Sequence, residues 1–175
     1  ILAVLGSSGS GKSLLAHAIL GILPDNADLK GEIKYNGNDL NQKSKEEIRG
    51  KEISLIPQSV NFLDPLMKIA DQVIGECETE EECREKQIKQ RKIFEKYGLS
   101  EDVDNMYPFQ LSGGMARRVL ISTALLSNPK LIIADEPTPG LDQKSVKETL
   151  DYLKQMADDN VGVLLITHDI YAALE

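Results

Sequence analysis

The sequence has few cysteines, fewer basic than acidic side chains and no long apolar run, and each shortage excludes a class of protein. Only Cys77 and Cys83 are cysteines among the 175 residues, and no histidine lies near them. Their number and spacing fit neither a disulfide framework nor a set of metal ligands, and are typical of a reducing cytosol. The 20 basic and 28 acidic residues give a formal net charge of -8, which disfavours general nucleic-acid binding.

Hydrophobic runs such as 161–166 fall far short of the roughly 20 apolar residues needed to cross a bilayer. No signal peptide is visible, so we expect any membrane association to come through partners. The length, with 41% hydrophobic residues, predicts one domain with a substantial core and room for an inserted subdomain. Because Ile1 already falls in a predicted strand and Glu175 in a predicted helix, we expect a fragment cut at both ends.

A glycine-rich turn, 6–13, joins a predicted buried strand, 1–5, to a helix predicted from Leu14. Its glycines permit backbone dihedrals that a side chain would obstruct, so successive N–H groups can converge on one anion. Lys12 is expected to reach the β- and γ-phosphates of a nucleotide, and the Ser13 hydroxyl to ligate Mg²⁺. An ordinary strand-to-helix turn is the alternative, and the flanking elements argue against it. The turn comprises Gly6, Ser7, Ser8, Gly9, Ser10, Gly11, Lys12 and Ser13.

Two further predicted strands deliver polar side chains to loops. Strand 52–56 leads to Gln58, whose amide can position Mg²⁺ or an attacking water. Taken alone, such a glutamine is more often an ordinary loop residue. Strand 161–166 leads to His168, which could contact a γ-phosphate or a catalytic carboxylate.

The predicted strand 130–134 runs directly into two acids, Asp135 and Glu136. Ligands bind at the carboxyl edge of a parallel sheet, which is where this strand ends. Successive side chains of a strand point in different directions, so the two carboxylates can divide the work. We expect Asp135 to hold Mg²⁺ and Glu136 to orient and polarise the attacking water.

The segment 59–110 differs from the rest and predicts a mainly helical insertion, in which Thr79 and Glu82 form a capping-box pattern. Before it, the alternating stretch 31–37 ends in an Asn-Gly turn and predicts a hairpin, and residues 43–49 predict a surface helix. The charge-laced face of the insertion indicates a solvated helix, and we infer no binding surface from it.

After this insertion, Leu111, Ser112, Gly113 and Gly114 open a helical pattern that continues to Leu126. A hydroxyl and free N–H groups at a helix start form a second anion-binding end. A plain N-cap followed by flexible glycines is the alternative. A chain with one phosphate loop has little use for a second in the same site, unless the second serves the nucleotide of another subunit.

Together, these motifs resemble those of the ATP-binding cassette (ABC) ATPases over the whole chain. The most specific element is Leu-Ser-Gly-Gly at 111–114 followed by Arg118. The resemblance implies an α/β P-loop NTPase fold, with a mainly parallel sheet flanked by helices. It also implies a single domain over 1–175 that divides into a RecA-like core, 1–58 and 116–175, and a helical subdomain with the signature motif, 59–115.

The resemblance assigns a role to each motif. It makes residues 6–13 the Walker A loop, Gln58 the Q-loop, Asp135 and Glu136 the Walker B residues, and His168 the switch histidine. Asp142 becomes the D-loop aspartate, and Leu111, Ser112, Gly113 and Gly114 the signature that faces the γ-phosphate of a second cassette. The residues Pro139 and Gly140 depart from the family's usual small pair in the D-loop.

Within that family, the stretches 22–26, 110–115 and 133–138 resemble oligopeptide, dipeptide and nickel importers. This implies an ATPase with ATP and Mg²⁺ as cofactors, peripheral on the cytoplasmic side of the membrane. Its implied partners are a second ABC ATPase subunit, integral membrane permeases and an extracytoplasmic solute-binding protein, with no nucleic acid. The coupling surface is expected around 58–67. One alternative is a soluble, non-transport ABC ATPase acting on DNA or ribosomes; another is a fragment that binds nucleotide without hydrolysing it.

Overall fold

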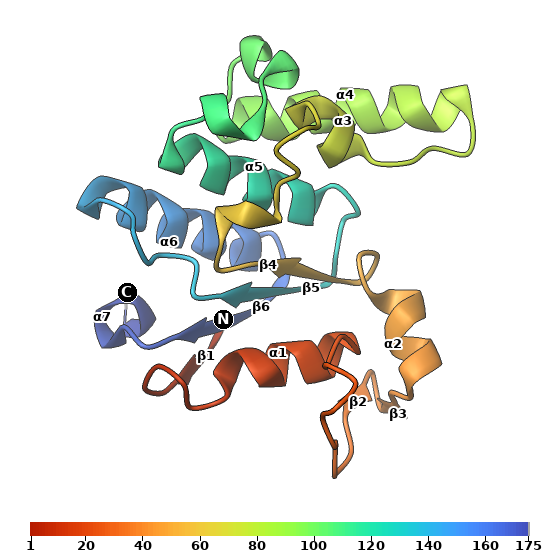
Figure 1. Cartoon of the computed structure of the whole chain (residues 1–175), viewed down its shortest axis with the longest axis vertical. Coiled ribbons are helices and arrows are strands. Elements are labelled where there is room, and N and C mark those ends of the chain that lie inside the picture. The colour runs from red at the N-terminus through yellow and green to blue at the C-terminus, as the bar shows by residue number, and fades with distance from the viewer. Residues whose placement is uncertain (175) are drawn as a thin grey trace.

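The computed structural model describes residues 1–174, and a four-stranded parallel sheet lies at its centre (Figure 1). The predicted helix position of Glu175 falls outside the described residues. The strands lie side by side in the order β1 (Leu2–Leu5), β6 (Gly162–Thr167), β5 (Leu131–Asp135) and β4 (Ile53–Ile56). Because all of them are parallel, their carboxyl ends meet at one edge, where the predicted polar residues follow.

Both faces of the sheet are covered by helices, as the nearly continuous apolar sequences of β5 and β6 require. Helix α1 (Lys12–Leu20) covers one face, where Ala16 and Leu20 pack on Ile133 and Ile166. The other face packs against α5 (Gly113–Leu125) and α6 (Gln143–Asp158). Alternate residues of β5 and β6 therefore serve opposite hydrophobic clusters, and the predicted α/β class is confirmed.

A third layer lies on the outer side of α5, at the end of the molecule farthest from α1 (Figure 1). It contains α3 (Ile69–Ile74), the long α4 (Glu80–Lys96) and the 3-10 helix η2 (Glu101–Asn105), and the predicted helical insertion is thus confirmed. Its own hydrophobic cluster includes Phe94 and Val103 together with Val119 and Leu120 from α5. Helix α5 therefore contacts both the sheet and the helical layer.

The smaller predicted elements are present with shorter bounds. The hairpin consists only of β2 (Lys34–Tyr35) and β3 (Asn38–Asp39), around an Asn-Gly turn in which both residues have positive φ. The surface helix is α2 (Gln42–Ile48). Short 3-10 turns η1 (Val60–Phe62) and η3 (Pro108–Gln110) flank the helical layer, and α7 (Ile170–Leu174) follows β6. No helix within residues 1–174 is both long and apolar enough to cross a bilayer.

The reading of the two cysteines is wrong, because Cys77 and Cys83 form a disulfide. Thr79 Oγ1 accepts a hydrogen bond from the Glu82 N–H at 3.1 Å, and this predicted N-cap turns the chain into α4. The turn lays the preceding loop against the first helical turn, so that the two Cα atoms lie 5.5 Å apart. Spacing alone did not reveal the pair, because the contact depends on this change of direction.

Candidate active site

The loop between β1 and α1 forms one wall of the site. Its backbone is left-handed at Gly9 and Gly11, with φ of 78° and 90°, a conformation that other residues rarely adopt. A Cβ atom on Gly6 would lie only 2.8 Å from Ser10 Oγ. The loop leads directly into the N-terminus of α1, where free N–H groups and the helix dipole favour an anion. The geometry of the predicted phosphate loop therefore explains why glycine occupies each of these three positions.

Lys12 occupies the first position of α1, and oxygen atoms surround its ammonium group. Its Nζ donates hydrogen bonds to the carbonyls of Gly6 at 2.8 Å and Ser7 at 2.9 Å. It also lies 3.5 Å from Glu136 Oε1, and both side chains of this ion pair are only 8% exposed. The fixed positive charge thus stands between the phosphate loop and the carboxylate at the end of β5.

Glu136 follows β5 directly and has a left-handed backbone, with φ of 45°. Such a conformation is strained in a residue with a side chain and is concentrated at functional sites. Its Oε2 lies 2.8 Å from His168 Nδ1 and 3.4 Å from the His168 N–H. Because a carboxylate only accepts hydrogen bonds, Nδ1 carries the proton and the other ring nitrogen stays available. The predicted contact between His168 and the carboxylate is present.

The second acid, Asp135, turns toward the start of α1 instead. Ser13 Oγ donates a hydrogen bond to Asp135 Oδ1 at 3.1 Å, across 122 residues of sequence. Two hard oxygen donors held this close fit Mg²⁺, which binds one or two carboxylates together with substrate phosphates. No three His, Cys, Asp or Glu side chains gather into a metal cage anywhere in residues 1–174.

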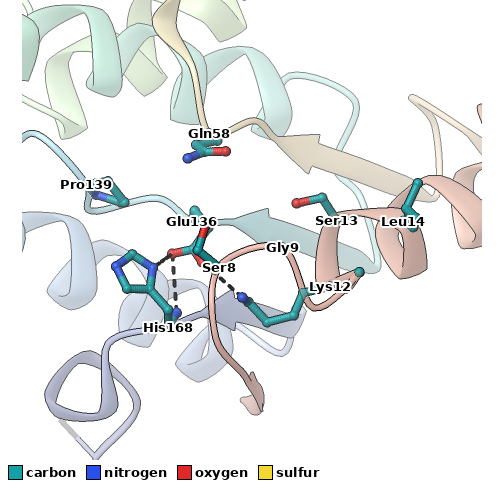
Figure 2. A pocket seen from close by; sticks show the side chains of 10 residues that line it. Ser8, Gly9, Lys12, Ser13, Leu14, Gln58, Glu136, Pro139 and His168 are labelled. Atoms are coloured by element: carbon teal, nitrogen blue, oxygen red, sulfur yellow. Dashed lines mark hydrogen bonds and ion pairs between the residues drawn. The ribbon is translucent and has the colours of Figure 1, made fainter.

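Lys12, Ser13, Glu136 and His168 line one cavity of about 380 Å³ (Figure 2), and Asp135 reaches it only through its bond with Ser13. Gln58 enters from the loop after β4 and lies across the cavity from the phosphate loop, above Glu136 in the view of Figure 2. The structure therefore brings together the four segments that follow β1, β4, β5 and β6 at the same sheet edge. The lining residues are Ser8, Gly9, Gly11, Lys12, Ser13, Leu14, Gln58, Glu136, Pro139 and His168.

The signature residues lie elsewhere, in a groove of about 600 Å³ that shares no lining residue with the cavity. Ser112, Gly113 and Gly114 line one side at the exposed N-terminus of α5, and Ser112 Oγ caps the helix by accepting from the Met115 N–H at 3.2 Å. The opposite side comes from the start of α6. Within one chain, the two predicted anion sites therefore do not meet.

Asp142 and Leu111, both predicted for the site, also lie outside the cavity and have structural contacts. Asp142 is the N-cap of α6, accepting from the N–H groups of Lys144 and Ser145, and it lines the groove. The hydrogen bond from the Ser145 hydroxyl, at 2.7 Å, lowers the pKa of Asp142. Leu111 packs on the hydrophobic cluster of the helical layer.

Comparison with known proteins agrees with this geometry. The family described as "ABC transporter" matches residues 1–139. The chain belongs to the ABC transporter family. Its structure is similar to the dimeric structure of MJ0796, described as a bacterial ABC transporter cassette, with a TM-score of 0.81. The two sequences are 30% identical, and the match covers 99% of this chain and 77% of that chain. A post-hydrolysis state of the same cassette, bound to ADP and Pi, gives a TM-score of 0.79 with 31% identity over 99% and 76% of the two chains.

This ABC chain is similar in sequence to ATP-binding proteins of oligopeptide transport. It is 38% identical to OppD of Lactococcus lactis subsp. cremoris over 100% of this chain and 55% of the relative. It is 36% identical to AppD of Bacillus subtilis over 96% of this chain and 55% of the relative. The chain thus spans about half the length of these curated relatives.

Two cavity residues of this ABC domain, Leu14 and Pro139, were not predicted as part of the site. Leu14 directly follows Ser13 in the first turn of α1. Pro139 lines the nucleotide cavity although the sequence pattern marked it only as a departure in the D-loop. It follows Glu136 by three residues in the loop that leaves β5, so proximity to the strand end was the available signal. Proline has no N–H group, so this position offers the cavity a fixed apolar ring and no backbone donor.

Proposed function

We propose that this chain is the ATP-binding part of an ABC importer subunit, and that it hydrolyses ATP to ADP and phosphate. One observation carries the proposal: the strained, buried Glu136 is held between the Lys12 ammonium and the His168 ring at the mouth of a phosphate-binding loop. A carboxylate held in this way can accept a proton from a water molecule that attacks a γ-phosphate.

Each neighbour of that carboxylate has a distinct task in the proposed reaction. Lys12 neutralises phosphate charge from the first turn of α1, as preorganised cations do in phosphoryl transfer. His168 donates its Nδ1–H to the carboxylate and fixes its orientation, and a second proton on the other ring nitrogen would let that nitrogen donate to a phosphate oxygen. Gln58 offers both an amide donor and an acceptor toward the attacking water or the metal.

Ser13 and Asp135 are the proposed Mg²⁺ ligands, with Gln58 as the third. When bound, the metal supplies positive charge that stabilises the phosphoryl group in transfer. The Ser13–Asp135 hydrogen bond keeps the two donors together, so little reorganisation is needed before they bind a cation.

We also propose the division into a RecA-like core, 1–58 and 116–175, and a helical subdomain, 59–115. The separate hydrophobic cluster of the helical layer supports this division. Helix α5 lies across the proposed boundary, because Ile121 and Ala124 pack toward the sheet while Val119 and Leu120 pack toward α4 and η2.

The proposed functional unit contains a second cassette. Ser112–Gly114 lie in a groove apart from the nucleotide cavity, so they can act on a phosphate only if a neighbouring copy presents it. The similar MJ0796 cassette is described as dimeric, which supports this arrangement. Asp142, on the other side of the same groove, would then also lie near the second nucleotide.

Membrane permeases are the proposed partners that convert cassette closure into transport, from the cytoplasmic side of the membrane. The expected coupling surface, 58–67, supports this because Phe62 is 66% exposed and Leu66 is 87% exposed beside the nucleotide loop. We propose an oligopeptide as cargo, delivered by an extracytoplasmic solute-binding protein, since the relatives above are named for oligopeptide transport. Nickel, the other expected cargo, has no support in those names.

Loss of the loop lysine tests the proposed function. In the full-length protein, Lys12→Ala should weaken ATP affinity by at least about tenfold, or about 1.4 kcal/mol, because it removes the cation beside the phosphates. Lys43→Ala, on the exposed surface of α2, is the matched control and should bind ATP like the wild type. Equal ATP affinity of the Lys12 variant and the wild type, measured by fluorescent-nucleotide titration, would refute the phosphate-loop assignment.

The soluble alternative is tested by reconstitution. For an importer, ATPase activity should rise when the full-length protein is assembled with its permeases and peptide-loaded binding protein in proteoliposomes. Stimulation by DNA or ribosomes, with no response to the permeases, would instead favour the non-transport ATPase.

A further inference from the structure

Helix α5 carries a buried arginine that no motif accounts for. Arg117 is 3% exposed, within a helix whose neighbouring residues Ala116, Val119 and Leu120 are also buried. No Asp or Glu within residues 1–174 forms an ion pair with it, although a guanidinium buried without a counter-charge is costly. Burial lowers the pKa of Arg117, in keeping with this cost. Such a residue needs a specific reason to occupy the interior.

Its hydrogen bonds supply that reason. Arg117 Nη1 donates to the carbonyl of Pro57 and Nη2 to the carbonyl of Gln58, each at 2.7 Å. These carbonyls belong to the two peptide groups that flank the Gln58 Cα atom. A planar fork that binds both groups fixes two successive peptide planes, and with them the direction of the Gln58 side chain.

No other hydrogen bond in the described chain holds Gln58 in place. Its side chain makes no hydrogen bond, and neither Pro57 nor Gln58 makes a backbone hydrogen bond outside the sheet. Gln58 nevertheless lines the nucleotide cavity opposite the phosphate loop. Its position therefore depends on its backbone, and the polar contacts of that backbone come from Arg117.

The arginine also joins Gln58 to the signature helix. Arg117 follows Gly113 by four residues, so it lies one helical turn from the N-terminus that lines the groove. A displacement of α5 would move the guanidinium and hence the loop that it holds. The two bonds thus connect α5, whose N-terminus lines the groove, with the loop that carries Gln58 into the cavity.

We propose that Arg117 is a positioning residue that holds Gln58 in the nucleotide cavity and links it to the position of α5. The inference rests on the proposed ATPase function for its kinetic consequences. Its structural part, the hold on residues 57–58, does not require hydrolysis.

The test uses Arg117→Met in the full-length protein assembled with its partners, because methionine retains bulk and removes every donor. Loss of a residue that supports a metal ligand typically costs 10–100-fold in metal affinity or activity. We expect the Mg²⁺ concentration for half-maximal ATPase to rise about tenfold and kcat to fall by a similar factor. The affinity for ATP without metal should change less than about twofold, since Lys12 and its loop are untouched.

Three comparisons separate positioning from general stability. Arg91→Gln removes an arginine of the helical layer that binds Asp104, not the loop, and should leave the Mg²⁺ dependence unchanged. Gln58→Ala combined with Arg117→Met should be no more impaired than Gln58→Ala alone, because the arginine acts through the glutamine. Arg117→Lys keeps a charge that can reach one carbonyl, so its Mg²⁺ requirement should lie between those of the wild type and Arg117→Met.

Amide hydrogen exchange supplies a readout that does not depend on activity. In Arg117→Met, exchange should accelerate in peptides covering residues 58–63 and not in those covering α4. A folded variant with wild-type exchange and Mg²⁺ dependence overturns the proposal, as does equal loss of ATP affinity with and without metal. If the wild type itself does not hydrolyse ATP, the proposed function fails, and the exchange result still decides the role of Arg117.

Discussion

Replacement of Glu136 by glutamine should separate ATP binding from ATP hydrolysis. Glutamine has the same shape, and its amide can keep a hydrogen bond to His168, which lies 2.8 Å from the carboxylate. Lys12 keeps its bonds to the carbonyls of Gly6 and Ser7. The variant therefore loses one negative charge and one proton acceptor while the cavity keeps its form.

The size of the effect follows from the lost chemistry. A positioned general base contributes about 10²–10⁴-fold to a rate, which corresponds to about 3–5 kcal/mol of activation free energy. ATP affinity should be equal or tighter, because the removed charge lay 3.5 Å from the Lys12 ammonium that receives phosphate. Stability should fall, because the nearly buried Lys12 ammonium loses its carboxylate partner, and the Lys12 bonds to the carbonyls of Gly6 and Ser7 should limit that loss.

The assay compares single-turnover hydrolysis with ATP binding in the full-length protein. Glu47→Gln, the same change on the exposed side of α2, serves as the control and should hydrolyse ATP like the wild type. If Glu136→Gln is folded, binds ATP and turns it over within about twofold of the wild-type rate, Glu136 is not the general base.

Two further predictions concern stability. Replacing both Cys77 and Cys83 by serine should lower the free energy of unfolding by about 2 kcal/mol, because the disulfide closes a short loop. Dithiothreitol should lower the urea midpoint of the wild type and not of the variant, and equal sensitivity contradicts the disulfide. Burial raises the pKa of Tyr97 to about 12, above the ordinary value of 10.0. The neutral Tyr97 side chain therefore contributes fully to the free energy of unfolding below pH 10, and about 2–3 kcal/mol of that free energy is lost as the pH rises toward 12. Because its hydroxyl has no hydrogen-bond partner within residues 1–174, Tyr97→Phe should cost little at pH 7 and lose less stability in alkaline urea titrations. Identical alkaline losses in both proteins would contradict this.

Local patterns in the sequence were enough to predict most of the sheet and much of the cavity. The strand-turn-helix pattern of residues 1–20 depends on glycine spacing and apolar runs, both of which act within a few residues. Each strand that ends in a polar residue could be recognised in the same way. Because the strands are parallel, their ends had to meet at one edge, which brought Gln58, Glu136 and His168 to one cavity.

Features that depend on long-range packing could not be predicted in this way. The bonds from Arg117 to Pro57 and Gln58 span 60 and 59 residues, and no local rule pairs them. A signal was present, since Arg117 shares the face of Ile121 and Ala124, which pack toward the sheet, at spacings of four and seven residues. A charged residue on the apolar face of a predicted helix indicates either that the face is assigned wrongly or that the charge has a buried polar partner.

The backbone at Glu136 shows how two adjacent acids come to serve two different partners. Asp135 is still paired with Ile166 in the sheet, and the Glu136 N–H extends the ladder by donating to the Ile166 carbonyl at 2.8 Å. In a regular strand the next side chain would leave on the opposite face. The left-handed turn at Glu136 instead directs its carboxylate to Lys12, while Asp135 reaches Ser13, the next residue of α1. Asp135 and Glu136 at the end of β5 thus contact Ser13 and Lys12 at the start of α1. The strained backbone of Glu136 allows both contacts to form beside the same cavity.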